Sequence, residues 1–370
     1  MNVLVSGAGV AGLALAVNLS ARGHQVTVVE RSSHFRVNGS PIDIRGDSLQ
    51  ITEKMGLLGQ IKDNRVRMSE LSQFVDSNGD TIASFPADEA SDSPDDIEIA
   101  REDLANILAA ALPSEVTVRF LDSLDSITDD GAGVDVHFVS GLAERYDLVF
   151  GADGQHSGVR RLAFGPESEY LRHLGLYVAL ADLPEQARPD RMNPMYNYPG
   201  HLGGIARYKD KALAVLMFRS ELLDYDYHDL GAQKKILTDA FAGHTEWKLP
   251  ELLDAARRDP ELYFDSVSQI HMDTWHKGRV ALVGDAAHCA ALLSGRGTSL
   301  ALTGAYFVAE ELGESGGDHT SAFENYETRQ RPYVTFAQAS VGTGGATMVP
   351  ETQEDLDARN ERVRAMSVTG

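Results

Sequence analysis

The N-terminal stretch constrains the fold more than any other, because it combines a strand, a glycine-rich turn, a helix and a second strand. An apolar run at residues 3–5 leads into Gly7, Gly9 and Gly12, and a segment of small and aliphatic residues follows. Glycines at this spacing permit a tight turn, close approach of backbone N–H groups to a pyrophosphate, and close packing of helix on strand. The string alone also occurs in ordinary turns, but here the flanking strand and helix are both present. The stretch therefore predicts a dinucleotide-binding unit.

The next strand ends at Glu30, roughly 20 residues after the glycine motif, where such units carry the acid that binds a ribose diol. An acid at that place disfavours a 2′-phosphate, so NADP is not expected in this site.

The composition is that of a globular protein with more acidic than basic residues. The 370 residues include 55 Asp and Glu against 33 Lys and Arg, for a net charge of −22. This balance opposes nonspecific binding to nucleic acid or anionic membranes, and it also keeps a surface soluble. Cys289 is the single cysteine, which excludes an intrachain disulfide and a Cys-rich zinc site and indicates a cytoplasmic location. No apolar run is long enough to span a bilayer, and glycines interrupt the N-terminal apolar segment.

The strand, glycine turn and helix pattern recurs twice further along the chain. One apolar strand leads into Gly151-Ala152-Asp153-Gly154, and another leads into Gly284-Asp285, followed by a helix that opens at Gly295 and Gly297. Between them, residues 171–268 form longer alternating strands with one helix, which is typical of an α+β unit on an antiparallel sheet. Residues 71–85 predict a hairpin that belongs to this second sheet. A helix is also predicted at residues 48–58, and another at 321–342 before a polar tail.

Four stretches, in this order, resemble the FAD-dependent aromatic hydroxylases of the p-hydroxybenzoate hydroxylase type. They are the opening glycine motif with Glu30-Arg31, the helix at Arg101, Gly151-Ala152-Asp153-Gly154 with Ser157 and Arg160-Arg161, and Gly284-Asp285-Ala286-Ala287-His288 with Gly295 and Gly297. Within that family, Ile42-Asp43-Ile44 and Ile97-Glu98-Ile99-Ala100-Arg101 are most similar to the tetracycline-inactivating flavin monooxygenases.

The resemblance implies an α/β fold: a discontinuous Rossmann-like FAD-binding domain on a parallel sheet, an inserted α+β substrate domain on an antiparallel sheet, and a C-terminal helix. The FAD-binding domain would comprise residues 1–70, 97–170 and 269–330, the substrate domain residues 71–96 and 171–268, and the helix and tail residues 331–370.

The resemblance also implies noncovalent FAD and a set of residues that hold it. These are Gly7, Gly9, Gly12, Glu30, Arg31, Asp43, Arg101, Asp153, Asp285, Gly295 and Gly297. Glu30 would hold the adenosine ribose, Arg101 and Asp43 would lie near the flavin and its tether, and Asp285 would bind the ribityl-pyrophosphate region. Asp153 would serve FAD and the transient NAD(P)H together, and Arg36 would meet the nicotinamide cofactor. The alternative is that charged residues such as Arg36 and Asp43 are solvated loop residues that do not contact a cofactor.

The implied reaction uses NADPH or NADH and O2 to hydroxylate an aromatic or polyketide-like small molecule through a flavin hydroperoxide. No side chain is expected to act as acid, base or nucleophile, and no metal is expected. The inserted sheet would line the substrate with Tyr196, Tyr198, Arg207, Met217 and Arg219, although the two tyrosines are better explained one by one as core or interface aromatics. The protein is expected to be a monomer or weak homodimer.

One departure concerns the loop before Gly295, where relatives usually carry proline and this chain has Ala291 and Leu292. A change in the stiffness of that loop bears on the oxygen chemistry, so a flavin-dependent reductase or desaturase is an alternative. A non-enzymatic flavin sensor is a second, and the absence of a Trp-x-Trp-x-Ile-Pro motif counts against a halogenase. Cys289 would be a covalent flavin anchor or, as we expect, a small buried thiol. His288 is expected to hold its loop by hydrogen bonding and not to act as a base.

Overall fold

The computed structural model describes residues 1–35, 40–66, 71–86, 93–184, 192–209, 211–342 and 344–369. Its first layer is a six-stranded sheet, in which every neighbouring pair is parallel except β17 and β18. In spatial order its strands are β17 (His276–Lys277), β18 (Val280–Leu282), β11 (Leu148–Gly151), β1 (Asn2–Ser6), β2 (Gln25–Glu30) and β7 (Thr117–Phe120). Strand β1 lies between β2 and β11, so the chain reverses its direction of travel across the sheet at β1. Open parallel sheets bind ligands at such a switch point, beyond the carboxyl ends of the strands.

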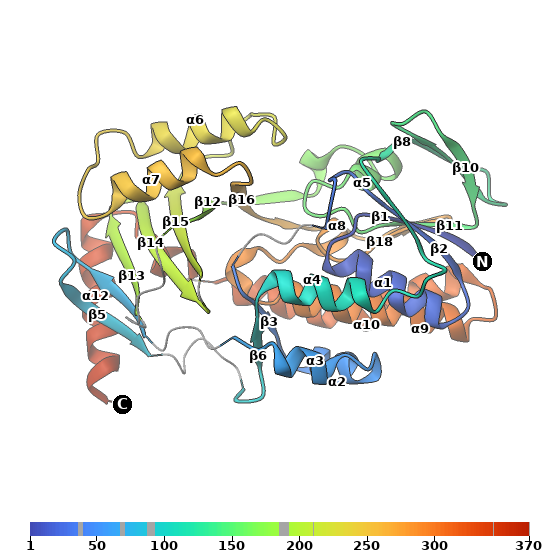
Figure 1. Ribbon diagram of the computed structural model, residues 1–370, viewed down its shortest axis with the longest axis horizontal. Helices are drawn as coiled ribbons and strands as arrows, with labels where there is room; N and C mark the ends of the chain where they lie inside the picture. Colours follow the sequence, from blue (N-terminus) through green and yellow to red (C-terminus); the bar gives the residue numbers. More distant parts are fainter. Residues whose placement is uncertain are drawn as a thin grey trace.

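Both faces of this sheet are covered, which explains why its central strands read as continuous apolar runs. Helices α1 (Val10–Ala21) and α9 (Gly297–Glu314) pack together, and α10 (His319–Ser340) packs on α9. Helix α4 (Arg101–Ala110) lies beside α1. A small antiparallel sheet of β8 (Leu124–Asp129), β9 (Val134–Phe138) and β10 (Ala143–Tyr146) lies across the six-stranded sheet from these helices (Figure 1).

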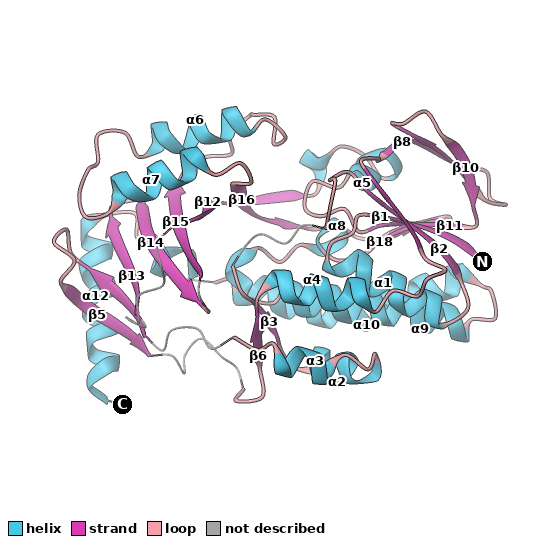
Figure 2. Ribbon diagram, viewed as in Figure 1, coloured by secondary structure: helices cyan, strands magenta, loops and turns pink. Residues whose placement is uncertain are grey.

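The second large sheet has seven strands and lies at the other end of the molecule (Figure 2). Its strands, in order, are β16 (Tyr263–Ile270), β12 (Leu171–Asp182), β15 (Lys211–Arg219), β14 (His201–Tyr208), β13 (Met192–Tyr198), β4 (Leu71–Val75) and β5 (Thr81–Pro86). All pairs are antiparallel except β13 with β4. The hairpin β4–β5 joins this sheet, as its sequence predicted. Helices α6 (Leu230–Ala240) and α7 (Leu249–Arg258) cover one face.

Two predicted segments differ from the structure. The helix predicted at residues 48–58 is divided into α2 (Asp47–Lys54) and α3 (Leu58–Asp63), because Gly56 lies between them with a φ of 74° that ends a right-handed helix. The polar tail contains helix α12 (Gln353–Thr369), which follows the short helix α11 (Gly344–Met348). Helix α12 packs on β5 and β13, and the fully buried Arg359 places its guanidinium 3.4 Å from the centre of the Phe74 ring. Tertiary contacts therefore stabilise a helix whose sequence has no clear apolar face.

The predicted domain boundaries stay a prediction. Strand β16 spans residues 263–270 and so crosses the boundary placed at residue 268. Arg36 lies outside the described residues. Within the described part of the chain, no helix has both the length and the apolar character needed to cross a membrane.

Candidate functional site

The three glycine turns lie against one another at the carboxyl ends of β1, β11 and β18. A Cβ atom added at Gly7, whose φ is 103°, would lie 2.4 Å from the carbonyl oxygen of Ala152. A Cβ atom added at Gly284 would lie 2.8 Å from the Cβ atom of Ala11. The first turn therefore touches the second, and helix α1 touches the third. Packing this close requires glycine, so the motifs that are far apart in sequence form one surface.

The first turn is open where a phosphate would approach. A Cβ atom added at Gly12 would lie 1.9 Å from the carbonyl oxygen of Gly7, so this glycine lets the helix pack on the turn. A Cβ atom added at Gly9 would have no neighbour within 4 Å. None of the described side chains caps the first turn of α1, whose N-cap residue is Gly9. Free N–H groups beside open space at a helix N-terminus fit a pyrophosphate.

Glu30 is held in place by the turn itself. Its carboxylate oxygens accept hydrogen bonds from the backbone N–H of Ala8 and from that of Ser32, each at 2.8 Å. These two bonds fix the carboxylate beside the glycine turn, in the position that the ribose assignment requires. The next residue, Arg31, is an exposed side chain whose guanidinium lies 2.6 Å from Nδ1 of His228.

Asp43 lies beside the turn that opens helix α9. Strand β3 (Ile42–Ile44) pairs with β6 (Ile97–Ile99), so Asp43 lies opposite Glu98, and the chain enters α4 at Arg101 directly after this strand. The Asp43 carboxylate accepts a hydrogen bond from Arg45 at 2.9 Å. A Cβ atom added at Gly295 would lie 3.6 Å from both side chains. For Gly297, the same construction finds no neighbour within 4 Å, which leaves the N-terminus of α9 approachable.

Asp285, in the third turn, lies close enough to Arg101, the first residue of α4, for their charges to interact. The Asp285 side chain is exposed, yet desolvation by the surrounding protein raises the pKa of its carboxyl, and the charge of Arg101 opposes that rise. An accessible side chain that neighbouring protein still desolvates lies in a concave part of the surface. Among the described residues, no hydrogen bond or ion pair of Arg101 is present. The pair therefore leaves an acceptor and a cation available to a ligand.

Asp153 of the second turn is used to fix its own helix. It accepts hydrogen bonds from the Ser157 hydroxyl and, at 3.0 Å, from the backbone N–H of Val159 at the start of α5 (Gly158–Ala163). Burial raises the pKa of its carboxyl, and these bonds oppose the rise. The fully buried Arg160 then donates to the Ala286 carbonyl oxygen at 2.9 Å, so the second motif holds the third.

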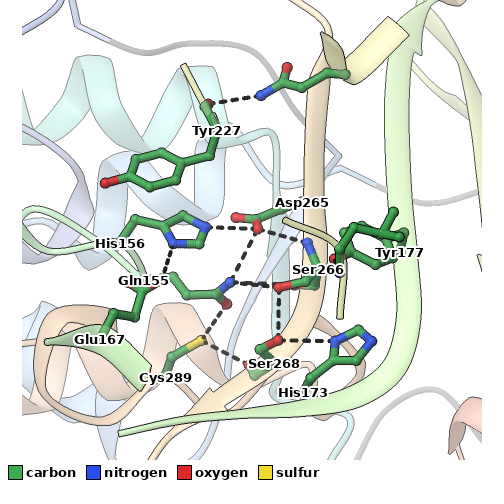
Figure 3. Close-up of polar contacts among 12 residues, drawn as sticks. Gln155, His156, Glu167, His173, Tyr177, Tyr227, Asp265, Ser266, Ser268 and Cys289 are labelled. Carbon is green, nitrogen blue, oxygen red and sulfur yellow. Dashed lines mark hydrogen bonds and ion pairs between the residues drawn. The ribbon is translucent and has the colours of Figure 1, made fainter. Parts of the chain in front are cut away.

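A polar network joins these turns to the seven-stranded sheet (Figure 3). The imidazole of His156 lies 2.8 Å from the carboxylate of Glu167, in the short helix η2 (Glu167–Glu169), and 3.0 Å from that of Asp265 on β16. Burial by itself lowers the pKa of His156, but hydrogen bonds to the two carboxylates outweigh it and raise the pKa to about 9. Gln155 donates to Asp265 at 3.2 Å, and its side-chain oxygen lies 3.5 Å from the sulfur of Cys289. The network therefore ties β16 to the loop that follows the third turn.

Comparisons with known proteins agree with this geometry. The family described as "FAD binding domain" matches residues 1–192 and 263–339. A flavin-dependent monooxygenase of Legionella longbeachae is 34% identical over 372 residues, which cover 99% of this chain and 95% of that protein. The chain belongs to the FAD-dependent monooxygenases. An uncharacterised protein of Mycobacterium tuberculosis is 40% identical over 361 residues, covering 96% of each chain. The crystal structure of tetracycline destructase Tet(51) superposes with a TM-score of 0.86 at 32% identity, covering 99% of this chain and 96% of that one.

The family and the fold class predicted from the sequence are thereby confirmed, as is FAD as the cofactor. The residues present fit that group: open N–H groups at Gly9, a fixed acid at Glu30, and the exposed Asp285 beside Arg101. The roles of the individual residues stay predictions. A groove of about 830 Å³ lies on the outside of α10 and is lined by residues such as Asp273 and Phe336. None of the predicted cofactor residues lines it.

Two residues of the third motif, Cys289 and His288, are buried in the core. Cys289 is 6% exposed, and burial together with the nearby charge of Asp285 raises the pKa of its thiol, so it packs as a neutral group; that it does not anchor the flavin stays a prediction. His288 is 1% exposed, and burial lowers its pKa to about 3. Its Nε2 atom lies 3.5 Å from the Tyr326 hydroxyl. A neutral histidine in the core cannot act as a base toward a ligand outside it.

The loop that lacks proline is held by hydrogen bonds. Ala291 has φ 72° and ψ 152°, a conformation that proline, with φ near −65°, cannot adopt and that is strained for any residue except glycine. The Gln269 amide donates to the Ala290 carbonyl at 3.3 Å, and the Gln338 amide donates to that of Cys289 at 3.2 Å. The two glutamines therefore stiffen the backbone of the loop that lacks proline. Sequence reasoning missed both, because their partners are distant in the chain.

The five predicted substrate residues lie on two different faces of the seven-stranded sheet. Tyr196 packs in the cluster formed with α6 and α7, and Tyr198 stacks at 4.0 Å on the ring of His244 beside it. Strand alternation places Arg207 on the same face as the buried Ile205 of that cluster. Met217 lies on the opposite face, where the buried cluster includes Ala291.

Arg219 also lies on the loop-facing side, since it lines a pocket with Leu293. We therefore retain only Met217 and Arg219 as candidates for substrate contact. A tyrosine whose ring is covered by helices has no access to a ligand bound at the loop.

Proposed function

We propose that this monooxygenase uses NADPH or NADH and O2 to hydroxylate an aromatic or polyketide-like small molecule. The observation that carries the substrate class is the similarity to tetracycline destructase Tet(51) along nearly the whole of both chains. A substrate would lie between the loop of Ala291 and the face of the seven-stranded sheet that carries Met217. When bound, FAD would supply the redox chemistry by taking a hydride from NAD(P)H and activating O2.

The residues of this chain would bind, orient and shield the reacting groups. The N-terminus of α1 would hold the pyrophosphate, and Glu30, fixed by two backbone N–H groups, would hold the ribose. Arg101 and Asp285 would lie at the flavin and its tether, with Arg101 favouring negative charge there. The hydrogen-bonded loop would shield the flavin, and Cys289 would keep its proton beside it. No protein acid or base takes part.

We propose that NAD(P)H binds only transiently and has no dinucleotide-binding domain of its own. The described residues contain one complete dinucleotide-binding unit, and Glu30, beside its glycine turn, would commit this unit to FAD. The nicotinamide cofactor would therefore visit a surface near Asp153 and Arg36, the second of which lies outside the described residues. Flavin reduction would depend on the flavin or a loop moving outward, and motions of this type gate turnover in many enzymes. Followed anaerobically by stopped flow, reduction should therefore be slow with NADPH alone and faster with a bound aromatic ligand. Rapid reduction with a stable NADPH complex would contradict this.

The test of the function is turnover of tetracycline by the purified FAD-loaded protein. NADPH and O2 consumption should rise when tetracycline is added, and mass spectrometry with isotopically labelled O2 should find one labelled oxygen atom in the product. A product that is oxidised or reduced without the label would identify a desaturase or reductase. A protein that holds FAD but consumes no NADPH or NADH in air, with or without tetracycline, would be a flavin sensor.

Two further points belong to the proposal. A cytoplasmic location is supported by the single buried Cys289, which suits a reducing compartment. A monomer or weak homodimer is expected, and light scattering of the FAD-loaded protein would measure it.

A further inference from the structure

A partly open pocket lies beneath the loop of Ala291, on the loop-facing side of the seven-stranded sheet. Its volume is about 360 Å³, within the range of roughly 300–1,000 Å³ of small-molecule sites. Strands β12, β15 and β16, the short helix η3 (Leu292–Ser294), the end of α10 and the start of α11 form its walls. Its apolar lining comes from Leu174, Leu176, Leu293 and Val341. The apolar walls would accept the body of a ring compound.

Arg219 is the one charged residue among those that line the pocket. Its Nε donates to the Val349 carbonyl at 2.7 Å, and one terminal nitrogen lies 3.5 Å from the Gly345 carbonyl. No carboxylate of the described residues forms an ion pair with it. The other terminal nitrogen makes no hydrogen bond within the described structure. The guanidinium is therefore positioned by two carbonyl groups and retains donors and an unneutralised charge.

The other polar groups of the pocket are already engaged. The Gln269 amide donates to the carbonyls of Ala290 and Gln338, and its oxygen lies 2.8 Å from Nε2 of His271. The Gln338 amide donates to the carbonyls of Ile270 and Cys289. These side chains give the pocket a rigid wall and few free donors. Recognition of a polar ligand group would thus depend on Arg219.

The sign of the charge selects the ligand. The chain as a whole carries −22, which repels anions at long range. Salt screens charges beyond about 8 Å at physiological ionic strength, so the potential inside the pocket is set by Arg219. A guanidinium matches a carboxylate or a delocalised enolate in geometry as well as charge.

We propose that this pocket binds an organic anion with an apolar ring body, and that Arg219 holds its carboxylate or enolate group. The proposal deepens the proposed function, on which it rests, by assigning an acidic group to the substrate. Leu293 lines the pocket and is followed by Gly295, beside Asp43, so the anion would lie against the loop that borders the cofactor site. The anionic group would orient the ring body, and no bond of the ligand changes at Arg219.

The test is isothermal titration of the FAD-loaded protein, without NAD(P)H, using 2-naphthoate and its neutral isostere 2-naphthamide. Arg219→Gln removes the charge, and Arg219→Lys retains it. Leu174→Trp fills the pocket from its half-buried rim without touching the bonds of Arg219. Arg258→Gln is the matched control, because Arg258 is an exposed arginine on helix α7, which covers the opposite face of the sheet.

We expect 2-naphthoate to bind the wild type and Arg258→Gln equally, and to bind Arg219→Gln at least about tenfold more weakly, as loss of one ionic hydrogen bond implies. Arg219→Lys should recover part of the affinity, and 2-naphthamide should not distinguish Arg219→Gln from the wild type. Leu174→Trp should abolish binding of both compounds, which keeps the test informative if Arg219→Gln fails to fold.

Equal 2-naphthoate affinity in the wild type and Arg219→Gln, undiminished binding to Leu174→Trp, or no binding to the wild type would each overturn the proposal. Because no turnover is measured, these outcomes are separate from failure of the tetracycline assay.

Discussion

Replacing Gly9 and Gly12 separately by alanine should distinguish a glycine needed for the cofactor from one needed for the fold. At Gly9, φ is −76° and ψ is −174°, which alanine adopts without strain, and the added Cβ atom meets nothing within 4 Å. At Gly12, the added Cβ atom would lie 1.9 Å from the Gly7 carbonyl oxygen, where no flexible side chain can yield. Gly9→Ala should therefore fold, and Gly12→Ala should not pack its first helix on the turn.

The expected magnitudes follow from these contacts. Gly9→Ala should leave the unfolding free energy of the apoprotein unchanged or raise it by about 0.4–1 kcal/mol, because alanine restricts the unfolded chain. Its methyl group would occupy the space through which a phosphate reaches the N–H groups of α1. Loss of one ionic hydrogen bond costs about 1.5–3 kcal/mol, so FAD should bind roughly 10- to 150-fold more weakly. Gly12→Ala should lose about 1–3 kcal/mol or more of stability by overpacking.

The assay has two readings on each apoprotein: thermal unfolding, and titration with FAD followed by flavin fluorescence. Gly23→Ala is not a suitable control because its φ is 81°, whereas Gly59→Ala adds a methyl group to open space on the distant helix α3. Wild-type FAD affinity in Gly9→Ala would refute the assignment of the pyrophosphate to this turn. Wild-type stability in Gly12→Ala would refute the packing argument.

Three further predictions concern the third motif and the network around His156. Asp285→Ala should weaken FAD binding about 5- to 150-fold, because the cofactor's donors lose an acceptor worth about 1–3 kcal/mol. His288→Ala should lower the melting temperature and leave more FAD bound than Asp285→Ala does. Equal FAD content in the two variants would show that the motif is wrongly assigned. Gln338→Leu should remove the hydrogen bonds that the amide donates to the carbonyls of Ile270 on β16 and Cys289 in the loop, and so raise the hydrogen peroxide released per NADPH consumed, measured by a peroxidase-coupled assay; unchanged coupling would contradict a stiffening role. The pKa of His156 is raised to about 9 from 6.5, so the stability it contributes is present in full below pH 6.5 and is lost as the pH rises through 9. Urea unfolding midpoints should fall over that range in the wild type and in the control His137→Gln, whose side chain is exposed, but stay level in His156→Gln; parallel pH profiles would refute the linkage.

The sequence by itself determined those parts of the cofactor site in which the chemistry requires a particular residue type at a fixed spacing. Gly7 and Gly12 are needed because their added Cβ atoms would overlap backbone, and Glu30 is needed as an acceptor beside the turn. Such requirements are local, so they are visible as a motif. The buried strands of the six-stranded sheet are visible for a similar reason, since cover on both faces requires continuous apolar runs.

Tertiary structure decided which face of the seven-stranded sheet meets the cofactor loop. Alternation predicts that Tyr196 and Tyr198 share a face, but it does not say whether helices or the loop cover that face. The support of the loop by Gln269 and Gln338, and the burial of Arg359 in a polar tail helix, likewise rest on contacts between residues far apart in the chain. A long polar side chain carries no sequence signal of its distant partner. Only the fold, by bringing Arg219 and Leu293 to one pocket, decides that a lone cation lies against apolar walls.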